Sequence, residues 1–531
     1  MDLTKLVTRL PQRSTSRIYS YENGRVVQRT HAEVYADVRA AVARLEGWGV
    51  KAGMRVGIRA PNCYQWIVYD LAIIELRAVS VAFTDDFNTT TAEELRDKYQ
   101  LSLLLVMASE RQRHSPQVNF VAYLDGENTN VAVACSNEPC TTSGKDFVNP
   151  WRIFSSGSVG GLKGLALNRK GVEAWVDGFT QAIAPRSDDR LLLFLPMSNF
   201  QQRPMYYAAL WYGFDLIVTD PARLFLALKD LKPTILVAPP TLFQAFETRF
   251  GNLPKWNQIA ARVAGNIVRL LPVRRARERV ARLVFKQAYE ALGERMRLMI
   301  TGMAPIKRAT LDLFRLMQLP LFETYGLIEC GSVTLNVPGA FRIGSVGRPL
   351  PGVQVELASD GEIIVRREPM VALGYFECAT GENEMTFIGD NRVASGDIGR
   401  LDKDGYLYLV GRKKEIIVTA GGDKVHPEVI ESEIDACPDV AKSVVLKDPD
   451  VPALVAIVLP KDPSDEGARS RIEQFVNHNG GGHHRATMSI GKIVFTDLIF
   501  SRENGLLRPN LKLDRRKIAE HFRAEIAAFD S

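Results

Sequence analysis

The stretch GDIGRLDKDGYLYLVGRKKEIIVTAGGDKVHPEVIE, residues Gly396–Glu431, places charged side chains and glycines at the joints between short predicted elements. Its runs Tyr406–Val410 and Glu415–Thr419 are rich in β-forming residues, with Gly411 between them, and the glycine pair that follows stops the second run. Pro427 then opens a predicted helix, because proline fits the first helical turn and apolar residues recur after it at helical spacing. The order predicts two strands and a helix, with an acid, an arginine and two lysines where a nucleotide enzyme could need them.

The rest of the chain alternates predicted helices with short apolar runs. The amphipathic stretch His31–Trp48 precedes the apolar runs Arg55–Arg59 and Leu103–Val106. This alternation favours helices that cover the faces of a sheet, so the predicted fold class is α/β. We expect a large multi-layer N-terminal domain at residues 1–413 and a small, mobile α+β C-terminal domain at residues 414–531.

Composition limits the classes of protein to which this chain can belong. With 531 residues, 46% hydrophobic content and 24% charge, the chain can bury large cores. The net charge of +6 is small for this length and the basic residues are spread, which argues against a nucleic-acid substrate. Six cysteines without CxxC spacing are typical of free thiols in a reducing compartment. The N-terminus lacks an apolar signal core and no run approaches the roughly 20 apolar residues that span a bilayer, so we expect a soluble, cytoplasmic protein.

The segment Phe154–Gly164, FSSGSVGGLKG, has the composition of an anion-binding loop. Its four glycines allow backbone N–H groups to curl around an anion, its three serines add donors, and Lys163 supplies positive charge. Leu162 stands where the Walker pattern needs a glycine, so this is not a Walker loop. A triphosphate is the ligand that the segment favours.

Two further segments, Met296–Pro305 and Leu321–Glu329, are predicted strand ends joined through an amphipathic helix. If they converge, the aromatic ring of Tyr325 beside Gly326 could stack on a base, and the carboxylate of Glu329 could hold a divalent cation.

Taken in order, these motifs resemble those of the adenylate-forming enzymes, the superfamily of acyl-CoA synthetases, adenylation domains and luciferases. The resemblance runs from about Tyr35 to Ile518 and is strongest to the long-chain acyl-CoA synthetases. The glycine- and serine-rich segment is similar to the family's Thr-Ser-Gly-Thr-Thr-Gly-x-Pro-Lys-Gly loop. The matching residues are Ser156, Gly157, Gly160, Lys163 and Gly164, with Ser155 and Ser158 keeping hydroxyls in place of threonines.

The resemblance implies a role for each of these residues. It places Tyr325 against adenine, Asp397 and Arg412 on the ribose hydroxyls, and Glu329 on Mg²⁺. In the same way it assigns Lys512, in the segment NGLLRPNLKLDRR, to the charge that develops as pyrophosphate leaves ATP.

The resemblance also implies that the two halves move. Lys414 matches the family's hinge position, about which the small domain would turn to present Gly421 and Gly422 to a pantetheine thiol. An acyl pocket would be bordered by Asn199, which replaces a histidine within LPMSNFQQR, and by Met303, which replaces a glycine.

Several residues depart from the family pattern. Val159 and Ile328 each replace a hydroxyl-bearing residue near the phosphates, and Arg508 and Asn510 replace threonines near Lys512. Since losing one transition-state donor can slow a reaction on the order of a hundredfold or more, these changes motivate the alternative of a nucleotide- or acyl-binding protein with weakened catalysis.

The predicted function is ATP-dependent activation of a carboxylic acid, fatty or related, to acyl-AMP, with Mg²⁺ as cofactor, followed by transfer to CoA. A related alternative is an acyl-AMP or acyl-carrier-protein ligase, whose acceptor would be a phosphopantetheine arm. The basic segment Arg269–Lys286 predicts a helical surface that is either solvated or bound by an acidic carrier protein or an anionic membrane.

Overall fold

The computed structural model describes most of the chain. The described residues are 1–12, 15–113, 119–126, 128, 131, 149–156, 162–418, 424–447, 453–479, 490–501, 503–507 and 513–528. Among them, no helix has both the length and the apolar content that crossing a membrane requires. Cys63, Cys330, Cys378 and Cys437 are free thiols, as predicted for them.

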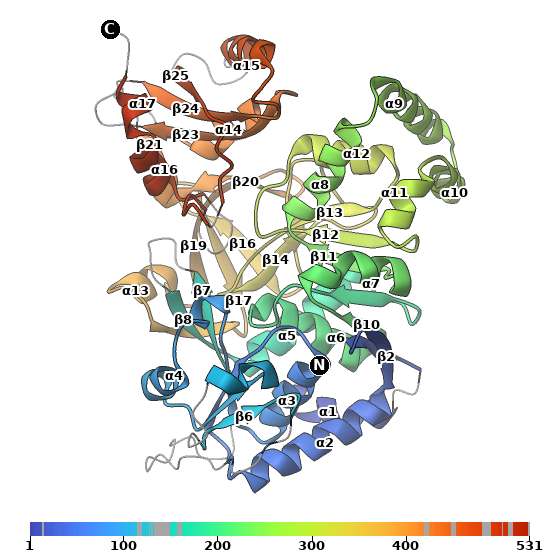
Figure 1. Cartoon of the computed structure of the whole chain (residues 1–531), viewed down its shortest axis with the longest axis vertical. Helices are drawn as coiled ribbons and strands as arrows, with labels where there is room; N and C mark the ends of the chain where they lie inside the picture. The colour runs from blue at the N-terminus through green and yellow to red at the C-terminus, as the bar shows by residue number, and fades with distance from the viewer. Residues whose placement is uncertain are drawn as a thin grey trace.

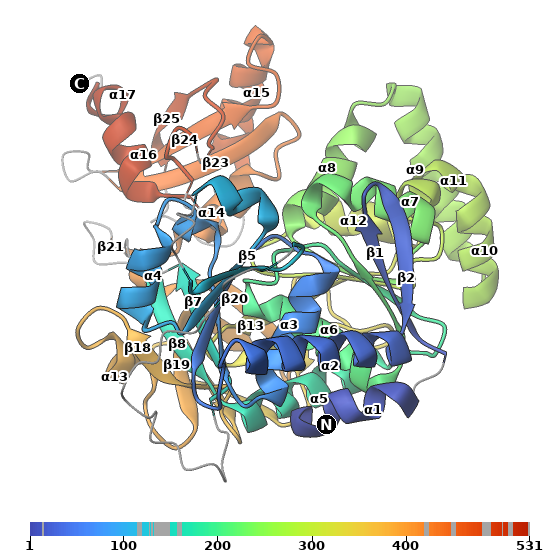
Figure 2. The same ribbon diagram turned by 60° about the horizontal axis from the view of Figure 1, so that its bottom comes forward.

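A seven-stranded sheet lies in the lower part of Figure 1. Its order is β18-β8-β7-β4-β3-β5-β6; the segment from β7 to β6 is parallel, and β8 pairs antiparallel with both β7 and β18. The helix of the longest amphipathic stretch, α2, comes to the front in Figure 2. The elements are α2 (His31–Gly47), β3 (Arg55–Arg59), α3 (Tyr64–Glu75), β4 (Val79–Ala82), α4 (Ala92–Tyr99), β5 (Leu103–Val106), β6 (Val121–Tyr123), β7 (Trp151–Ser156), β8 (Leu162–Leu167) and β18 (Ala372–Glu377).

A second, nine-stranded sheet has the order β15-β14-β13-β12-β11-β9-β10-β1-β2. Its five central strands and β1 run parallel, because helices connect them. The elements are β1 (Arg17–Glu22), β2 (Arg25–Thr30), α5 (Arg169–Ile183), β9 (Arg190–Leu193), α6 (Arg203–Tyr212), β10 (Asp215–Val218), α7 (Leu224–Leu231), β11 (Ile235–Ala238), α8 (Pro240–Gly251), α9 (Lys255–Leu270), α10 (Arg274–Val284), α11 (Lys286–Ala291), β12 (Leu298–Thr301), α12 (Arg308–Leu316), β13 (Leu321–Leu327), β14 (Gly331–Leu335) and β15 (Arg348–Pro349).

One apolar core joins these two sheets. It includes Ile58 of β3, Leu191 of β9, and the fully buried rings of Trp66 and Trp175 from α3 and α5. Most side chains of helix α3 are apolar, and the helix is buried over most of its length because it lies between the layers. The packing fixes the two sheets relative to one another.

The C-terminal part contains three smaller sheets. An antiparallel sheet β16-β17-β19-β20 leads to the pair β21-β22 and then to β23-β24-β25, which stands at the upper left of Figure 1 with α14–α17 around it. The elements are β16 (Val353–Leu357), β17 (Glu362–Arg367), α13 (Glu382–Thr386), β19 (Arg392–Leu401), β20 (Leu407–Arg412), β21 (Ile417–Val418), β22 (Lys424–Val425), α14 (Pro427–Ile434), β23 (Val440–Lys447), β24 (Leu454–Pro460), α15 (Glu466–Asn479), β25 (Ile490–Phe495), α16 (Arg515–His521) and α17 (Arg523–Ala527).

These elements confirm the predicted α/β class, the strands Arg55–Arg59 and Leu103–Val106, and the helix that begins at Pro427. The predicted strand Glu415–Thr419 is wrong at its start, because Lys413–Glu415 forms a 3-10 turn. Gly411 lies inside β20 rather than at a joint. A Cβ at this position would lie 3.0 Å from Nδ1 of His426, so a larger residue would require the imidazole to shift.

Candidate nucleotide-binding site

Tyr325, Asp397 and Arg412 come together from three strands. The hydroxyl of Tyr325, on β13, donates to Oδ2 of Asp397 over 2.8 Å. Nε of Arg412 lies 3.0 Å from the other oxygen, Oδ1, of the same carboxylate. Asp397 on β19 and Arg412 on β20 are direct partners in the antiparallel register, which explains why residues 15 positions apart meet.

Burial controls the electrostatics of this cluster. Burial and the neighbouring Asp397 carboxylate raise the pKa of Tyr325 well above its usual value, so its hydroxyl keeps its proton. Burial opposes the charge of Arg412, but Asp397, Glu415 and Glu428 outweigh it and raise the pKa of the guanidinium. The cluster thus presents a proton donor, a carboxylate acceptor and a fixed cation.

A second cluster gathers around Tyr375 on β18. The hydroxyl of Tyr375 donates to Oε1 of Glu329 over 2.6 Å. Nζ of Lys163, on β8, lies 4.9 Å from the centre of the same ring. Tyr375 therefore connects the lysine of the glycine- and serine-rich segment to the predicted magnesium ligand.

Glu382, the first residue of α13, bridges two lysines in this second cluster. Its Oε1 lies 3.2 Å from Nζ of Lys163 and 3.7 Å from Nζ of Lys414. Burial alone would raise the pKa of Glu382, but Lys163, supported by Lys414, lowers it below its usual value. A charged carboxylate therefore links the predicted phosphate-binding lysine to the predicted hinge lysine.

The lysine before the hinge is also anchored. Nζ of Lys413 lies 2.7 Å from Oε2 of Glu362, whose other oxygen accepts from the backbone N–H of Gly396 over 2.9 Å. Glu362 on β17 thereby holds both ends of the segment that carries Asp397 and Arg412.

Glycine at position 164 has a packing reason. A Cβ there would lie 2.4 Å from the ring of Phe376, so the absence of a side chain lets this ring pack over position 164. The predicted contact of Gly164 with phosphate stays a prediction.

The two predicted acyl-pocket residues lie in loops. Asn199 caps the 3-10 turn Phe200–Gln202, where its side chain accepts from the backbone N–H of Gln201. Met303 follows β12 in the left-handed backbone region, at φ 70, and is 40% exposed. Their contact with an acyl chain stays a prediction.

The remaining predicted site residues lie at or beyond the edges of the described segments. Ser155 and Ser156 end strand β7, with only their backbone described. Lys512, Gly157, Ser158, Val159, Gly160, Gly421, Gly422, Arg508 and Asn510 lie outside the described residues.

Sequence reasoning missed Tyr375 and Glu382. A tyrosine in a strand and an acid at the start of a helix are both common for structural reasons, so neither carries a signal of its own. Their importance arises from pairing with Glu329 and Lys163, which are distant in the chain.

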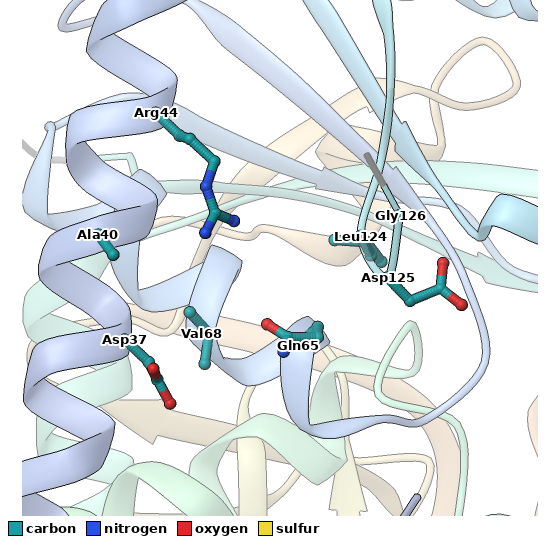
Figure 3. A pocket seen from close by; sticks show the side chains of 8 residues that line it. All are labelled: Asp37, Ala40, Arg44, Gln65, Val68, Leu124, Asp125 and Gly126. Carbon is teal, nitrogen blue, oxygen red and sulfur yellow. The ribbon is translucent and has the colours of Figure 1, made fainter. Parts of the chain in front are cut away.

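A cavity of about 400 Å³ lies elsewhere in the molecule (Figure 3). Helices α2 and α3 and the segment after β6 line it, and Arg44 extends into it from α2. The residues that line it are Asp37, Ala40, Arg44, Gln65, Val68, Leu124, Asp125 and Gly126. None of them belongs to the two clusters around Tyr325 and Tyr375.

The described carboxylates suit only a limited role toward Mg²⁺. Within the described part of the chain, no group of three or more His, Cys, Asp or Glu side chains could hold a metal ion. Mg²⁺ bound with a nucleotide commonly takes one or two carboxylates, while phosphates and waters complete its shell. Glu329, with one oxygen held by Tyr375, fits that limited role.

This fold belongs to a known class of enzymes: the chain is a member of the AMP-binding enzyme family, whose model matches residues 8–376. Among curated proteins, it is 30% identical to long-chain-fatty-acid–CoA ligase FadD15 of Mycobacterium bovis, over 94% of this chain and 92% of the relative. It is 25% identical to human long-chain-fatty-acid–CoA ligase 1, over 89% and 77% of the two chains.

Solved structures share the fold over the whole length. ATP-bound MatB from Rhodopseudomonas palustris aligns with a TM-score of 0.73 at 21% identity, over 99% of this chain and 100% of the other. The Bacillus subtilis o-succinylbenzoate-CoA synthetase MenE, in complex with its acyl-adenylate intermediate OSB-AMP, aligns with a TM-score of 0.71 at 18% identity, over 97% of each chain. The predicted membership of the adenylate-forming enzymes is confirmed.

Proposed function

We propose that this enzyme is an ATP-dependent long-chain fatty-acid–CoA ligase that forms acyl-AMP and pyrophosphate before the thioester. The observation that carries the proposal is the cluster of Tyr325, Asp397 and Arg412, which supplies an aromatic ring, a carboxylate and a guanidinium at one junction of strands. The similarity to fatty-acid–CoA ligases across most of the chain supports the choice of substrate.

The nucleoside would be held by this first cluster. The ring of Tyr325 would pack against adenine, while Asp397 accepts hydrogen bonds from the ribose hydroxyls. Arg412 donates to the same sugar through its planar fork of N–H groups, and its ion pair with Asp397 already orients it.

The phosphates would be held by the second cluster and its loop. We assign the backbone and hydroxyls of the glycine- and serine-rich segment, together with Lys163, to the triphosphate. Glu329 would hold Mg²⁺, which, when bound, offsets phosphate charge. The proposed phosphate-binding residues are Ser155, Ser156, Gly157, Ser158, Gly160, Lys163 and Gly164.

In the first step, a carboxylate oxygen of the acid attacks the α-phosphorus of ATP, and the bond to the β-phosphate oxygen breaks. Lys163 and Lys512 would stabilise the charge of the departing pyrophosphate. In the second step, a thiolate attacks the acyl carbonyl carbon, and the bond to AMP breaks to leave a thioester.

Between the steps, residues 414–531 would turn about Lys414 relative to residues 1–413. This movement would withdraw Lys512 and bring Gly421 and Gly422 to the thiol, while Asn199 and Met303 border the acyl chain. CoA is the proposed acceptor, and the phosphopantetheine arm of a carrier protein is the alternative that an acceptor assay separates.

Exchange of labelled pyrophosphate into ATP tests the first step. We expect exchange that depends on a long-chain fatty acid, and its loss in Lys512→Ala. Lys517→Ala, a matched change at an exposed lysine of α16, should leave exchange unaltered. If nucleotide binds but no fatty or aryl acid supports exchange, the ligase proposal fails and the nucleotide-binding alternative is favoured.

A further inference from the structure

Helices α9 and α10 form a pair that projects from the molecule. They lie at its edge in both views, at the upper right in Figure 1. Leu271–Val273, with Pro272 at its centre, joins them, so the predicted helical surface Arg269–Lys286 is interrupted near its start and consists mainly of α10. Leu253, just before α9, is exposed and belongs to the same surface.

Helix α9 presents its large apolar side chains to solvent. The opposite face of α9 packs closely against α12. At Gly265 a Cβ would lie 2.5 Å from the side chain of Leu316 on α12. The outward residues recur at helical spacing and are exposed by half or more, up to 81% for Trp256 and 83% for Leu270. They are Trp256, Ile259, Val263, Ile267 and Leu270.

Helix α10 continues this surface. Ala281 and Phe285 are buried toward the body of the protein, while Leu283 is 79% exposed. Val273, Val280, Leu283 and Val284 are the exposed apolar side chains of this part. Ten of the 23 exposed large apolar side chains in the described chain thus fall between Leu253 and Val284. Such a concentration marks an interaction surface.

The same surface has a larger net positive charge than the chain as a whole. Residues 253–286 contain nine Lys or Arg and one acid, Glu278, for a net charge of +8, which exceeds the +6 of the whole chain. Lys255, Arg262 and Arg269 recur every seven residues along α9, so they follow one edge of its apolar stripe.

We propose that α9 and α10 bind the surface of an anionic lipid bilayer, with the apolar stripe at the acyl boundary and the basic side chains on the phosphates. The features required for interfacial binding are a strongly amphipathic helix, Trp and Leu on the apolar face and Lys or Arg beside it, and the pair has all of them. An anionic bilayer is complementary to this patch: its phosphates would attract the basic side chains at the edges of the patch, and its acyl region would accept the apolar side chains at the centre.

The inference goes beyond the proposed ligase activity and does not depend on it. If the ligase activity and the bilayer binding are both correct, the enzyme would bind the membrane into which long-chain fatty acids partition.

Vesicle co-sedimentation of the full chain tests the proposal. We expect at least roughly tenfold tighter binding to vesicles with about one-third anionic lipid than to neutral vesicles, and weakening by salt. The double variant Trp256→Glu/Ile267→Glu should lose at least about tenfold, whereas the control Ile499→Glu, at a site 71% exposed on the C-terminal part, should bind as wild type does. Arg275→Glu/Arg279→Glu should remove the preference for anionic lipid.

Three results would overturn the proposal. The first is equal binding by wild type and the double variant, and the second is no binding to anionic vesicles. The third is a dimer, or a complex with an acidic carrier protein, that the double variant abolishes in solution while vesicle binding is unchanged. No substrate is present, so failure here is distinguishable from failure of the ligase proposal.

Discussion

At the scale of single residues, Glu382 forms an ion pair with Lys163, the lysine that is proposed to bind the phosphates of ATP. Its carboxylate lies 3.2 Å from Nζ of Lys163, and that charge would repel incoming phosphates. Glu382→Gln keeps the shape but removes the charge, so we expect the KM for ATP to fall by about two- to fivefold, the effect of up to about 1 kcal/mol. Initial rates of pyrophosphate exchange against ATP concentration measure this.

Glu384→Gln provides the matched control, since Glu384 lies on the same helix and is exposed. Its KM for ATP should equal that of wild type. An unchanged or higher KM in Glu382→Gln would show that the bridge positions Lys163 rather than competes for it.

Glu323 is the residue that should make stability depend on pH. Burial raises the pKa of this β13 carboxyl to about 7. The folded state therefore holds a proton that the unfolded chain has lost between about pH 4.5 and 7, so the stability that this group contributes falls as pH rises through 7. The loss is at most about 3 kcal/mol.

Urea unfolding of wild type and Glu323→Gln at pH 5 and at pH 8 measures the effect of this carboxyl. The variant stays neutral, so its free energy of unfolding relative to wild type should increase from the lower to the higher pH. A difference that is the same at both pH values would contradict the raised pKa.

At the scale of elements, a buried polar cluster joins α3, α6 and β4. Asp70 pairs with Nη1 of Arg203 at 3.2 Å and accepts from Ser80 over 2.8 Å and from the hydroxyls of Tyr206 and Tyr207. Both charged side chains are fully buried, so removing one partner leaves the other uncompensated.

We expect Asp70→Ala to lower the free energy of unfolding by about 3–5 kcal/mol, as measured by chemical denaturation. Asp70→Asn still accepts hydrogen bonds, so its free energy of unfolding should fall by less. This variant can be measured if Asp70→Ala does not fold. Asp312→Ala, at an exposed α12 pair with Arg308, should change stability by no more than about 0.5 kcal/mol. Similar losses at both sites would contradict a structural role for the buried pair.

The sequence could predict features that neighbouring residues determine, but not pairs of residues that only the tertiary fold brings together. Arg55–Arg59 and the helix after Pro427 follow from local periodicity and turn residues, and both are confirmed. Asp397 and Arg412 could be predicted to act together because they share one motif. The pairs Tyr375–Glu329 and Lys163–Glu382 could not, since their partners come from different elements and only the tertiary fold brings them together.

Local patterns also missed backbone details. The 3-10 turn at Lys413–Glu415 interrupts residues that favour a strand, and Lys413 is held there by Asp360 and Glu362. These ion pairs depend on residues in and next to β17, about fifty positions before the turn. The local sequence around the turn therefore does not indicate them.

At the scale of the whole molecule, one described contact connects the β23 sheet to the nine-stranded part. Nζ of Lys307, between β12 and α12, donates to the carbonyl oxygen of Ala441 on β23 over 2.9 Å. Burial lowers the pKa of Lys307, so this ammonium has given up water in order to make the contact. A connection of this kind would resist the turn proposed about Lys414.

Lys307→Met should therefore favour positions in which β23 has left this contact. A hydrogen bond from a charged donor contributes about 1.5–3 kcal/mol, so the population of separated states should rise by roughly tenfold or more. Tryptic cleavage at Lys413 and Lys414, both partly exposed, should accelerate in proportion. Lys461→Met, at an exposed position after β24, is the matched control and should be cleaved at the wild-type rate. Equal cleavage of the Lys307 and Lys461 variants would show that the contact does not restrain the C-terminal part.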